Sequence, residues 1–526
     1  MPAVPSYIQV LLPLKLQWIP TYSAPMPLEP GRRVCVVLSG RSYDGVVWRL
    51  LERPDLPPER IQPVVSVRDD LPAVTPEELR FWEFLSGYYL CTLGEVYKAA
   101  YPLLKVRSER TAADILARLH ARLEKKEREI AGRHSEHVAA RLAAEREQLL
   151  AQIAACSPKD AVSGPKPAPG NPLVLTGAKR RDAYLPALRE ALSAGFQALV
   201  LTPEIAFCDK LEALLAPDFG DSLHAFHSGK TPVRRRQMAD VLRAGTPAVV
   251  LGTRSALFLP FRRLALVIVD EEQDPAYKQS EPAPRYQGRD AAVALAGIHG
   301  ARVLLGAAVP SLETLLNVRI GKYGLRSLPG APAAAEVIDI PAERRKNGMN
   351  GTFSRKLIDA IRGTQGPVVL LRGWEKAGIL QEEAAALFPE RELRVCTLGA
   401  LKREGAGEAA LIAVLQADAL VSRDDFRSDE RAAQIVGTLC QFAPRVILQT
   451  AVPARFDGRR DADGLLAERQ QFHFPPFTRL VEVRRQGDGT VTERHFLPRD
   501  RELPARKAEL AARLPDGCYL DVDPVD

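Results

Sequence analysis

The segment from Leu266 to Gln273 constrains the fold of this chain most strongly, because four consecutive aliphatic residues are followed at once by three acidic ones. An aliphatic run bounded by charge predicts a central strand of a parallel sheet, and ligands of such sheets bind beyond the carboxyl ends of the strands. A carboxylate pair at this place is typical of nucleotide-dependent enzymes, in which the first acid holds Mg²⁺ and the second orients the attacking water. Asp270 and Glu271 are the candidates for these two roles, and Asp270 is the candidate magnesium ligand. An ordinary surface loop after a strand remains the alternative.

Short aliphatic strands alternate with helical stretches through two parts of the chain, roughly 172–330 and 331–453. Repeated βα units predict parallel, doubly wound sheets, so the fold class is α/β with two lobes. The strands expected in the first part are 172–176, 197–202, 248–251, 265–269 and 302–306, and those in the second are 367–371 and 445–449.

The remaining segments have other patterns. Residues 1–107 alternate apolar and polar positions between Pro and Gly residues, which predicts a small β-rich domain. Within it, Thr75 and Glu78 have capping-box spacing and predict a helix start. Residues 108–156 contain no Pro and many Arg, Glu, Ala and Leu residues, which indicates a helical or coiled-coil arm, and residues 157–171 predict a linker. Residues 454–526 form a short, charged C-terminal region.

Composition limits the class of protein. The chain has 526 residues, a net charge of +7 and a pI near 9.0, which fits a nucleic-acid partner but also fits an arginine-rich proteome. The seven cysteines are scattered without any C-x-x-C pair, so we expect reduced thiols and no zinc site. No run of about 18 apolar residues and no basic-then-apolar leader occurs, which predicts a cytoplasmic protein without a membrane contact.

Six motifs that follow predicted strands closely resemble, in order and spacing, the family of primosomal protein N′, the replication-restart DNA helicases of superfamily 2. They are Thr202–Ala206, Phe226–Gly229, Gly252–Phe258, Asp270–Gln279, Arg285–Asp290 and Gly306–Thr314. Further matches lie in the N-terminal region, in the second lobe and at Phe474–Leu480. The resemblance implies two RecA-like lobes, ATP and Mg²⁺ as cofactors, forked or single-stranded DNA as partner, and contact with primosome or single-strand-binding proteins.

The resemblance also implies DNA-contacting residues. In the N-terminal domain it points to a pocket for the 3′ end of a nascent strand, with Thr21, Tyr22 and Gly40 as candidates. On the first lobe it points to Arg254, Ser255, Lys278 and Arg285. A buried ion-pair role for Arg254 remains the alternative. His227 is interpreted as a structural loop residue, because no nucleophile and base surround it.

The chain departs from the family at the phosphate loop. Such a loop needs glycines, a Lys for the phosphates and a hydroxyl for Mg²⁺. In the register set by Tyr184, Arg180 stands at the Lys position and Arg181 at the hydroxyl position. Gly177, Lys179 and Arg180 are therefore the cofactor-binding candidates, and we expect ATP binding to be weak or lost.

Other family motifs have changed in the same direction. The Ser-Ala-Thr motif reads Ala307-Ala-Val309, and the arginine-finger motif retains only Arg445 as a candidate catalytic residue because Phe442 replaces the other finger. The zinc module is absent from the second lobe. The leading hypothesis is a DNA-binding protein at forks in replication restart, with little helicase activity. The alternatives are an active 3′→5′ helicase with an unconventional phosphate loop, and a structural adaptor that binds a protein through the helical arm.

Overall fold

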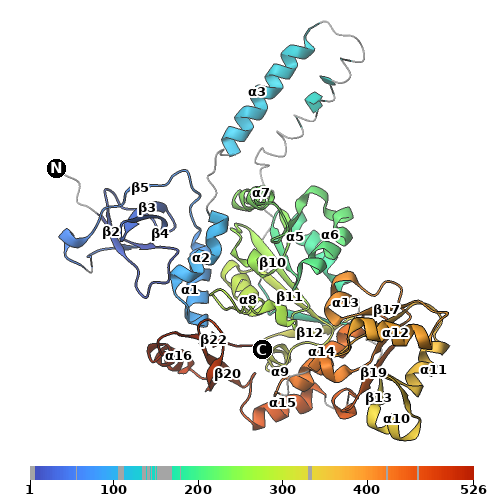
Figure 1. Cartoon of the computed structure of the whole chain (residues 1–526). Helices are drawn as coiled ribbons and strands as arrows, with labels where there is room; N and C mark the ends of the chain where they lie inside the picture. The colour runs from blue at the N-terminus through green and yellow to red at the C-terminus, as the bar shows by residue number, and fades with distance from the viewer. Residues whose placement is uncertain are drawn as a thin grey trace.

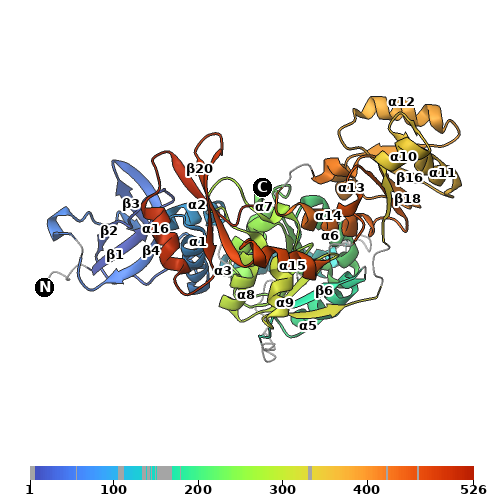
Figure 2. The same ribbon diagram turned by 90° about the horizontal axis from the view of Figure 1, so that it is seen from below.

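The computed structural model describes residues 6–54, 56–104, 112–132, 138, 142–143, 145–147, 150, 169–177, 179–329, 334–421, 425–458 and 461–525. The first lobe lies at the centre, the N-terminal sheet at one end and the second lobe at the other (Figures 1 and 2). The C-terminal sheet lies beside the N-terminal helices, and α3 projects away from the body (Figure 1). Most of the expected linker, residues 157–168, lies outside the described residues.

The N-terminal region is a five-stranded antiparallel sheet with the order β2-β1-β4-β3-β5. Its strands are β1 (Ser6–Leu11), β2 (Thr21–Ala24), β3 (Arg33–Leu38), β4 (Arg41–Leu51) and β5 (Ser66–Val67), with the 3-10 turn η1 (Pro58–Arg60) between β4 and β5. Ser39 and Gly40 both have positive φ, as the tight turn between β3 and β4 requires.

Two helices join this sheet to the first lobe, α1 (Pro76–Tyr89) and α2 (Leu93–Leu104). The predicted capping box at the start of α1 is confirmed: Glu78 N–H donates to Thr75 Oγ1 at 3.2 Å, and Thr75 N–H donates to Glu78 Oε2 at 2.9 Å. Helix α3 (Ala112–Ile130) covers the first part of the predicted arm, and most of the rest to residue 156 is not described.

The first lobe contains a seven-stranded parallel sheet with the order β12-β6-β11-β10-β7-β9-β8. Strand β10 is central and buried at every position. The strands are β6 (Leu173–Thr176), β7 (Gln197–Leu201), β8 (Leu223–Phe226), β9 (Ala248–Gly252), β10 (Leu264–Asp270), β11 (Arg302–Ala307) and β12 (Gly324–Ser327). The helices are α5 (Tyr184–Ser193), α6 (Ile205–Phe219), α7 (Pro232–Arg243), α8 (Gly288–His299) and α9 (Leu312–Arg319), with 3-10 turns η2 (Arg180–Ala183), η3 (Gly220–Ser222), η4 (Arg254–Phe258) and η5 (Pro275–Tyr277). Strands β8 and β12 were not predicted.

The second lobe contains a five-stranded parallel sheet with the order β13-β19-β18-β16-β17. Its strands are β13 (Glu336–Asp339), β16 (Val368–Leu371), β17 (Leu393–Cys396), β18 (Leu411–Val414) and β19 (Val446–Thr450), and β14 (Met349–Asn350) pairs with β15 (Phe353–Ser354) beside them. The helices are α10 (Ile340–Lys346), α11 (Arg355–Gly363), α12 (Ala377–Leu387), α13 (Leu398–Glu404) and α14 (Ser428–Leu439), with η6 (Ala417–Val421) and η7 (Pro453–Arg455). The chain therefore has two RecA-like α/β lobes.

The C-terminal region is a three-stranded antiparallel sheet with the order β21-β20-β22, built from β20 (Thr478–Arg485), β21 (Val491–Pro498) and β22 (Cys518–Val522) with helices α15 (Ala462–Gln471) and α16 (Leu503–Ala512). Its inner residues Val481 and Val522 share one buried cluster with Trp82 of α1 and with residues of the first lobe. Burial of a continuous apolar core across three regions fixes their relative positions.

Within the part of the chain that the structure describes, no helix is long and apolar enough to cross a membrane. The cysteines described there are free thiols, and no group of three or more metal-ligating side chains gathers among those residues.

Candidate nucleotide-binding site and flanking surfaces

The candidate site lies where three neighbouring strands of the first lobe end. Strand β11 stands between β6 and β10, with Gly306 opposite Leu175 on one side and opposite Asp270 on the other. A Cβ atom at Gly306 would lie 1.7 Å from the Tyr184 hydroxyl and 3.2 Å from Asp270 Oδ1. The missing side chain lets groups that follow β6 reach the carboxylate that ends β10.

The Tyr184 hydroxyl fills this space, and Arg180 bonds both carboxylates beside it. The Nε of Arg180 donates to Asp270 Oδ1 at 3.2 Å, and its Nη2 donates to Glu271 Oε1. Its Nη1 donates to Oε1 of Gln441 in the second lobe at 2.9 Å. The side chain is only 1% exposed, so one guanidinium joins both carboxylates and both lobes.

Three further donors complete the cluster. Arg181 Nε donates to Asp270 Oδ2 at 2.8 Å, and the Tyr184 hydroxyl donates to Asp270 Oδ1 at 3.0 Å. Gln273 Nε2 donates to Glu271 Oε2 at 2.9 Å. All four carboxylate oxygens therefore accept hydrogen bonds from the chain itself.

Burial and charge set the protonation of the cluster. Burial by itself would raise the pKa of Asp270, but Arg181 and Arg180 outweigh it and hold that pKa below its usual range. Burial raises the pKa of Glu271, which Arg180 opposes and the charge of Asp270 reinforces. Burial also raises the pKa of Tyr184 far above its usual value, so its hydroxyl remains a donor.

These residues do not fit a magnesium ion. Mg²⁺ prefers near-octahedral oxygen ligands at about 2.0–2.1 Å and keeps several waters. Here two arginines stand against the carboxylates that would hold it, and one of them is fully buried. To admit Mg²⁺ and phosphate, both guanidinium groups would have to leave, and removing one partner of a buried ion pair costs about 3–5 kcal/mol.

The other phosphate-loop candidates lie at the edge of this cluster. Gly177 has φ +98°, and a Cβ there would lie 2.3 Å from Leu328 O, so packing against the end of β12 already requires glycine. Lys179 is exposed at the start of η2. Neither residue contacts Asp270, and the loop presents arginine there instead.

Arg445 lies outside the cluster. It immediately precedes β19, and its Nε and Nη2 donate to the Glu336 carboxylate at 2.7 and 3.0 Å. The residue of the same motif that reaches the site is Gln441. The structure therefore gives no support to a catalytic Arg445, because its guanidinium is committed to a half-exposed ion pair in its own lobe.

The lobes also contact each other through buried polar groups. Asp274 pairs with Lys402 at 2.7 Å, and Glu313 pairs with Arg427 at 3.2 Å. Glu430 of α14 accepts from the N–H of Leu312 at the start of α9 at 2.9 Å. These interactions hold the lobes together around the arginine-filled site.

Apolar packing occurs where the family has its Ser-Ala-Thr motif. A Cβ at Gly437 of α14 would lie 2.5 Å from Val309 Cγ2 and 3.6 Å from Ala308 Cβ. The second lobe thus packs directly on Ala308 and Val309, and this contact uses their small apolar surfaces.

The candidate DNA contacts of the first lobe are mostly internal. Arg254 Nη1 donates to Ala276 O at 2.6 Å and to Lys278 O, so it ties together the loop after β10. Lys278 is 5% exposed and donates to Val522 O and Arg285 O, each at 2.7 Å, besides pairing with Asp521. A buried, fully bonded ammonium cannot contact a phosphate, so the expectation for Lys278 needs correction. Ser255 is exposed.

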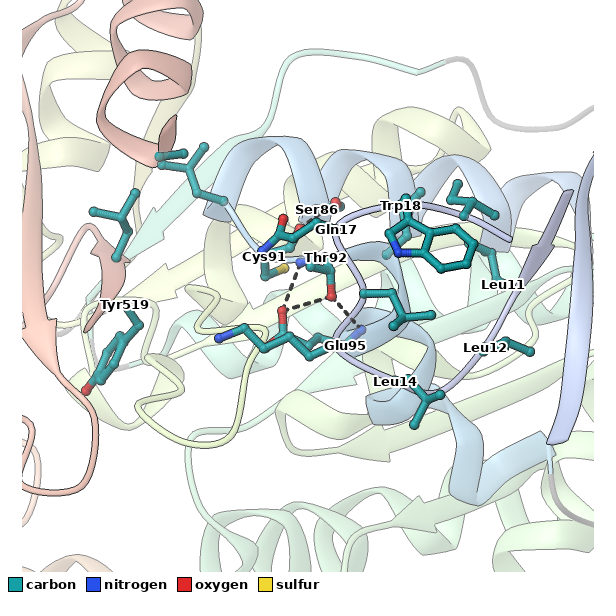
Figure 3. Close-up of a pocket in the computed structure, with 18 of the residues that line it drawn as sticks. Leu11, Leu12, Leu14, Gln17, Trp18, Ser86, Cys91, Thr92, Glu95 and Tyr519 are labelled. Atoms are coloured by element: carbon teal, nitrogen blue, oxygen red, sulfur yellow. Dashed lines mark hydrogen bonds between the residues drawn. The ribbon is translucent and has the colours of Figure 1, made fainter. Parts of the chain in front are cut away.

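Arg285 lies over the ring of Tyr519, 3.6 Å from its centroid, and pairs with Glu281 at 2.7 Å. It lines a cavity of about 490 Å³ between the loop after β1, the α1–α2 turn and the C-terminal region (Figure 3). Trp18, Thr92 and Glu95 also line this cavity, with Glu95 held by Thr92. Sequence reasoning missed it because its walls come from three distant segments.

The candidates of the N-terminal domain divide into core and surface. Tyr22 is buried, and its hydroxyl donates to Val37 O at 3.0 Å, so it braces the sheet. Thr21 is half-buried at the start of β2. Gly40 is open, with no atom within 4 Å of a would-be Cβ. Of these three, only Gly40 offers a backbone that a ligand could approach closely.

The two parallel sheets and the carboxylate pair between them define a two-lobed, helicase-like α/β protein with an antiparallel β domain in front. Residues 9–102 match the family model of the PriA 3'DNA-binding domain (3'BD). Replication restart protein PriA of Rickettsia conorii is 28% identical over 365 residues, covering 68% of this chain and 51% of that protein. The chain is thus similar to PriA proteins in its N-terminal domain and over part of their length.

Other relatives match a shorter part. The PriA proteins of Chlamydia pneumoniae and Haemophilus influenzae are 37% and 38% identical over 192 and 181 residues, covering 36% and 34% of this chain and 26% and 25% of those proteins. Where the match is longest, the chain spans about half the length of the relative.

Similar solved structures include RecG bound to a three-way DNA junction, with a TM-score of 0.37, 14% identity and coverage of 80% of this chain and 58% of that one. The DUF1998 helicase MrfA bound to DNA has a TM-score of 0.39, 13% identity and coverage of 64% and 56%.

Proposed function

We propose that the protein binds forked or branched DNA in replication restart and that its helicase activity is weak or lost. The proposed loss of helicase activity rests on Arg180, whose guanidinium donates hydrogen bonds to the carboxylate oxygens of Asp270 and Glu271. In a working motor these oxygens would face Mg²⁺ and the attacking water.

The match of residues 9–102 to a 3'DNA-binding domain supports DNA as the ligand. The net charge of +7 favours a phosphate backbone, which supplies most of the affinity of such complexes. In this proposal the β3–β4 turn at Gly40 and Thr21 at the start of β2 accept the 3′ end. Exposed Ser255 contacts the single-stranded backbone. Shape and phosphate contacts then give recognition without ATP.

The closed lobes support a static role. A motor must open and close its lobes with each nucleotide cycle. Here Lys402–Asp274, Arg427–Glu313 and the bond to Glu430 already hold the lobes together, and Arg180 links both through Gln441. The negative charges that Mg²⁺ would neutralise in a motor are neutralised here by Arg180 and Arg181.

The test is a calorimetric titration of the protein with ATP and Mg²⁺, together with ATP turnover on a forked DNA. We expect no binding in the micromolar range and no turnover above background. Fork-stimulated turnover that Glu271→Gln abolishes would overturn the proposed loss of the motor.

DNA binding is tested separately by fluorescence anisotropy. A fork with a 3′ hydroxyl at the branch is compared with duplex of the same length at about 0.15 M salt. We expect the fork to bind more tightly, with no change on adding ATP and Mg²⁺. Equal, weak binding to both DNAs would overturn the proposed recognition of forks.

A further inference from the structure

Four phenylalanines from three segments form an aromatic cluster at the junction of the second lobe and the C-terminal sheet. Phe426 stacks on Phe474 with ring centroids 4.8 Å apart and planes 15° apart. Phe496 of β21 lies 5.4 Å from Phe474, and Phe472 lies 6.2 Å from it. We call these four residues the aromatic ledge.

The outer rings of the ledge face solvent. Phe472 is 56% exposed and Phe496 is 37% exposed, whereas Phe426 and Phe474 are half-buried beneath them. An exposed phenylalanine is normal when it stands alone, but here both exposed rings contact Phe474, which stacks on Phe426, so the cluster offers flat apolar faces to a ligand.

Local backbone geometry holds the ledge rigid. Helix α15 ends at Gln471, and His473 then takes a positive φ of 54°. The N–H of Phe474 donates to Arg469 O at 2.8 Å, which closes a Schellman-type turn and directs Phe472 and Phe474 out of the helix. Thr478 Oγ1 donates to His473 O at 2.7 Å and fixes the turn from the other side.

A buried charge supports the ledge from below. The guanidinium of Arg469 lies 4.7 Å from the Phe426 ring centroid and donates to Glu430 Oε2 at 3.0 Å and to Pro475 O at 2.7 Å. The guanidinium of Arg427 lies 5.2 Å from the same ring. Arg427 also pairs with Glu313 of the first lobe. Arg469 pairs with Glu430, which accepts from Leu312 of the first lobe, so the ledge adjoins the interface between the lobes.

The rim of the ledge is polar and cationic. Gln470, Gln471 and His473 are exposed beside the rings. Arg499 is exposed, donates to Pro476 O at 2.7 Å and has no carboxylate partner among the described residues. The nearby carboxylate of Asp500 is already paired with Arg506 at 2.8 Å. One positive charge is therefore free at the edge.

We propose that the aromatic ledge binds unpaired bases of single-stranded DNA, with Arg499 on the adjoining phosphate. Exposed rings and a nearby cation are the pair of features that single-strand binding surfaces combine, because every base has a face that stacks. An apolar helix would dock in a concave hydrophobic groove, and a proline-rich peptide, which docks on aromatic rings, carries no phosphate for Arg499. The inference rests on the proposed DNA-binding function and adds a binding surface outside the N-terminal domain.

The experiment uses the full chain and a 20-nucleotide oligothymidylate, with binding measured by anisotropy. A second oligonucleotide carries 2-aminopurine, whose fluorescence is quenched by stacking. We expect Phe472→Ala and Phe496→Ala each to weaken binding by about 5- to 100-fold and to reduce the quenching. Phe472→Trp retains affinity, whereas Phe472→Leu loses it as the alanine variant does.

Trp374→Ala is the matched control, because Trp374 is a 66% exposed aromatic residue elsewhere on the second lobe. It should bind like the parent. Arg499→Gln should lower the slope of log affinity against log salt by about 0.7, the value for one phosphate contact on a single strand. The phenylalanine variants leave this slope unchanged.

The outcomes separate the two proposals. If the parent protein binds neither fork nor oligothymidylate, the proposed function fails and the ledge proposal fails with it. If the parent binds both and the two alanine variants bind as tightly, only the ledge proposal is overturned. If Phe472→Leu keeps full affinity, the contact is apolar and is not base stacking, which also overturns it.

Discussion

Nε of Arg180 donates a hydrogen bond to Oδ1 of Asp270 across 90 positions of sequence, at a distance of 3.2 Å. The same guanidinium reaches Glu271 and Gln441, so a residue from the phosphate loop neutralises the carboxylates that define the site. The chain thus carries its own counter-ion in place of a metal.

Removing that counter-ion should destabilise the fold. Arg180→Met leaves Asp270 and Glu271 buried without one of their two positively charged partners. We therefore expect a loss of about 3–5 kcal/mol in the free energy of unfolding, measured by urea denaturation. Adding Asp270→Asn and Glu271→Gln to Arg180→Met should recover much of this loss, because a whole buried ion cluster can be replaced at little net cost. Equal stability of the single and triple variants would contradict the counter-ion role.

Restoring the phosphate loop should restore nucleotide binding. The triple variant Lys179→Gly, Arg180→Lys, Arg181→Thr supplies the missing glycine, lysine and hydroxyl and frees the carboxylate oxygens. We expect ATP with Mg²⁺ to raise its melting temperature in proportion to the logarithm of ligand concentration, as binding to the folded state requires. The parent protein, titrated alongside, should show no such rise. A triple variant that ATP leaves unchanged would mean that something besides the arginines blocks the site.

Local patterns predicted much of the fold. The aliphatic run before Asp270 predicted β10, and the spacing of Thr75 and Glu78 predicted the start of α1, because both depend on neighbours in sequence. Strands β8 and β12 were missed: β12 is an edge strand of mostly exposed residues with no apolar run to mark it. The short, charged C-terminal tail proved to contain a three-stranded sheet.

The site was harder to predict because its partners come from distant segments. The motif changes at Arg180 and Arg181 indicated a damaged phosphate loop, but no local pattern indicated that these arginines would bond Asp270. Lys278 was predicted to contact DNA, but its ammonium bonds to Asp521 and Val522, which lie more than 240 positions away in the sequence. Burial of a charged side chain depends on tertiary contacts, which a single sequence does not record.

Glu430 should hold the lobes together. Its carboxylate accepts from Leu312 N–H at 2.9 Å and from Arg469 at 3.0 Å. We expect Glu430→Ala to cost about 3 kcal/mol, since it leaves a buried guanidinium unpaired, and to raise the radius of gyration in small-angle scattering. Glu336→Ala is the control, because its half-exposed pair with Arg445 should contribute less than about 1 kcal/mol. The same result for both variants would rule out this role of Glu430.

Lys507 should make stability depend on alkaline pH. Burial lowers the pKa of its ammonium to about 8, which the charge of Asp523 only partly offsets. Between pH 8 and the ordinary lysine value near 10.5 the unfolded chain binds the extra proton and the folded chain does not, so this residue's contribution rises with pH. The free energy of unfolding of the parent minus that of Lys507→Met should increase by up to roughly 3 kcal/mol from pH 7.5 to 10.5. A flat or falling difference would show that the ammonium is not desolvated.

Gly306 should be the position in the first lobe least able to accept a side chain. A Cβ there would lie 1.7 Å from the Tyr184 hydroxyl, so Gly306→Ala must displace that hydroxyl from Asp270, and we expect a loss of about 1–3 kcal/mol by thermal denaturation. Gly297 of α8 is the matched control: nothing lies within 4 Å of its would-be Cβ, so Gly297→Ala should stabilise the helix by about 0.5–1 kcal/mol. Tyr184→Phe in the Gly306→Ala background removes the clashing oxygen and should recover part of the loss. No recovery would place the strain in the backbone of β11 and not in the contact with Tyr184.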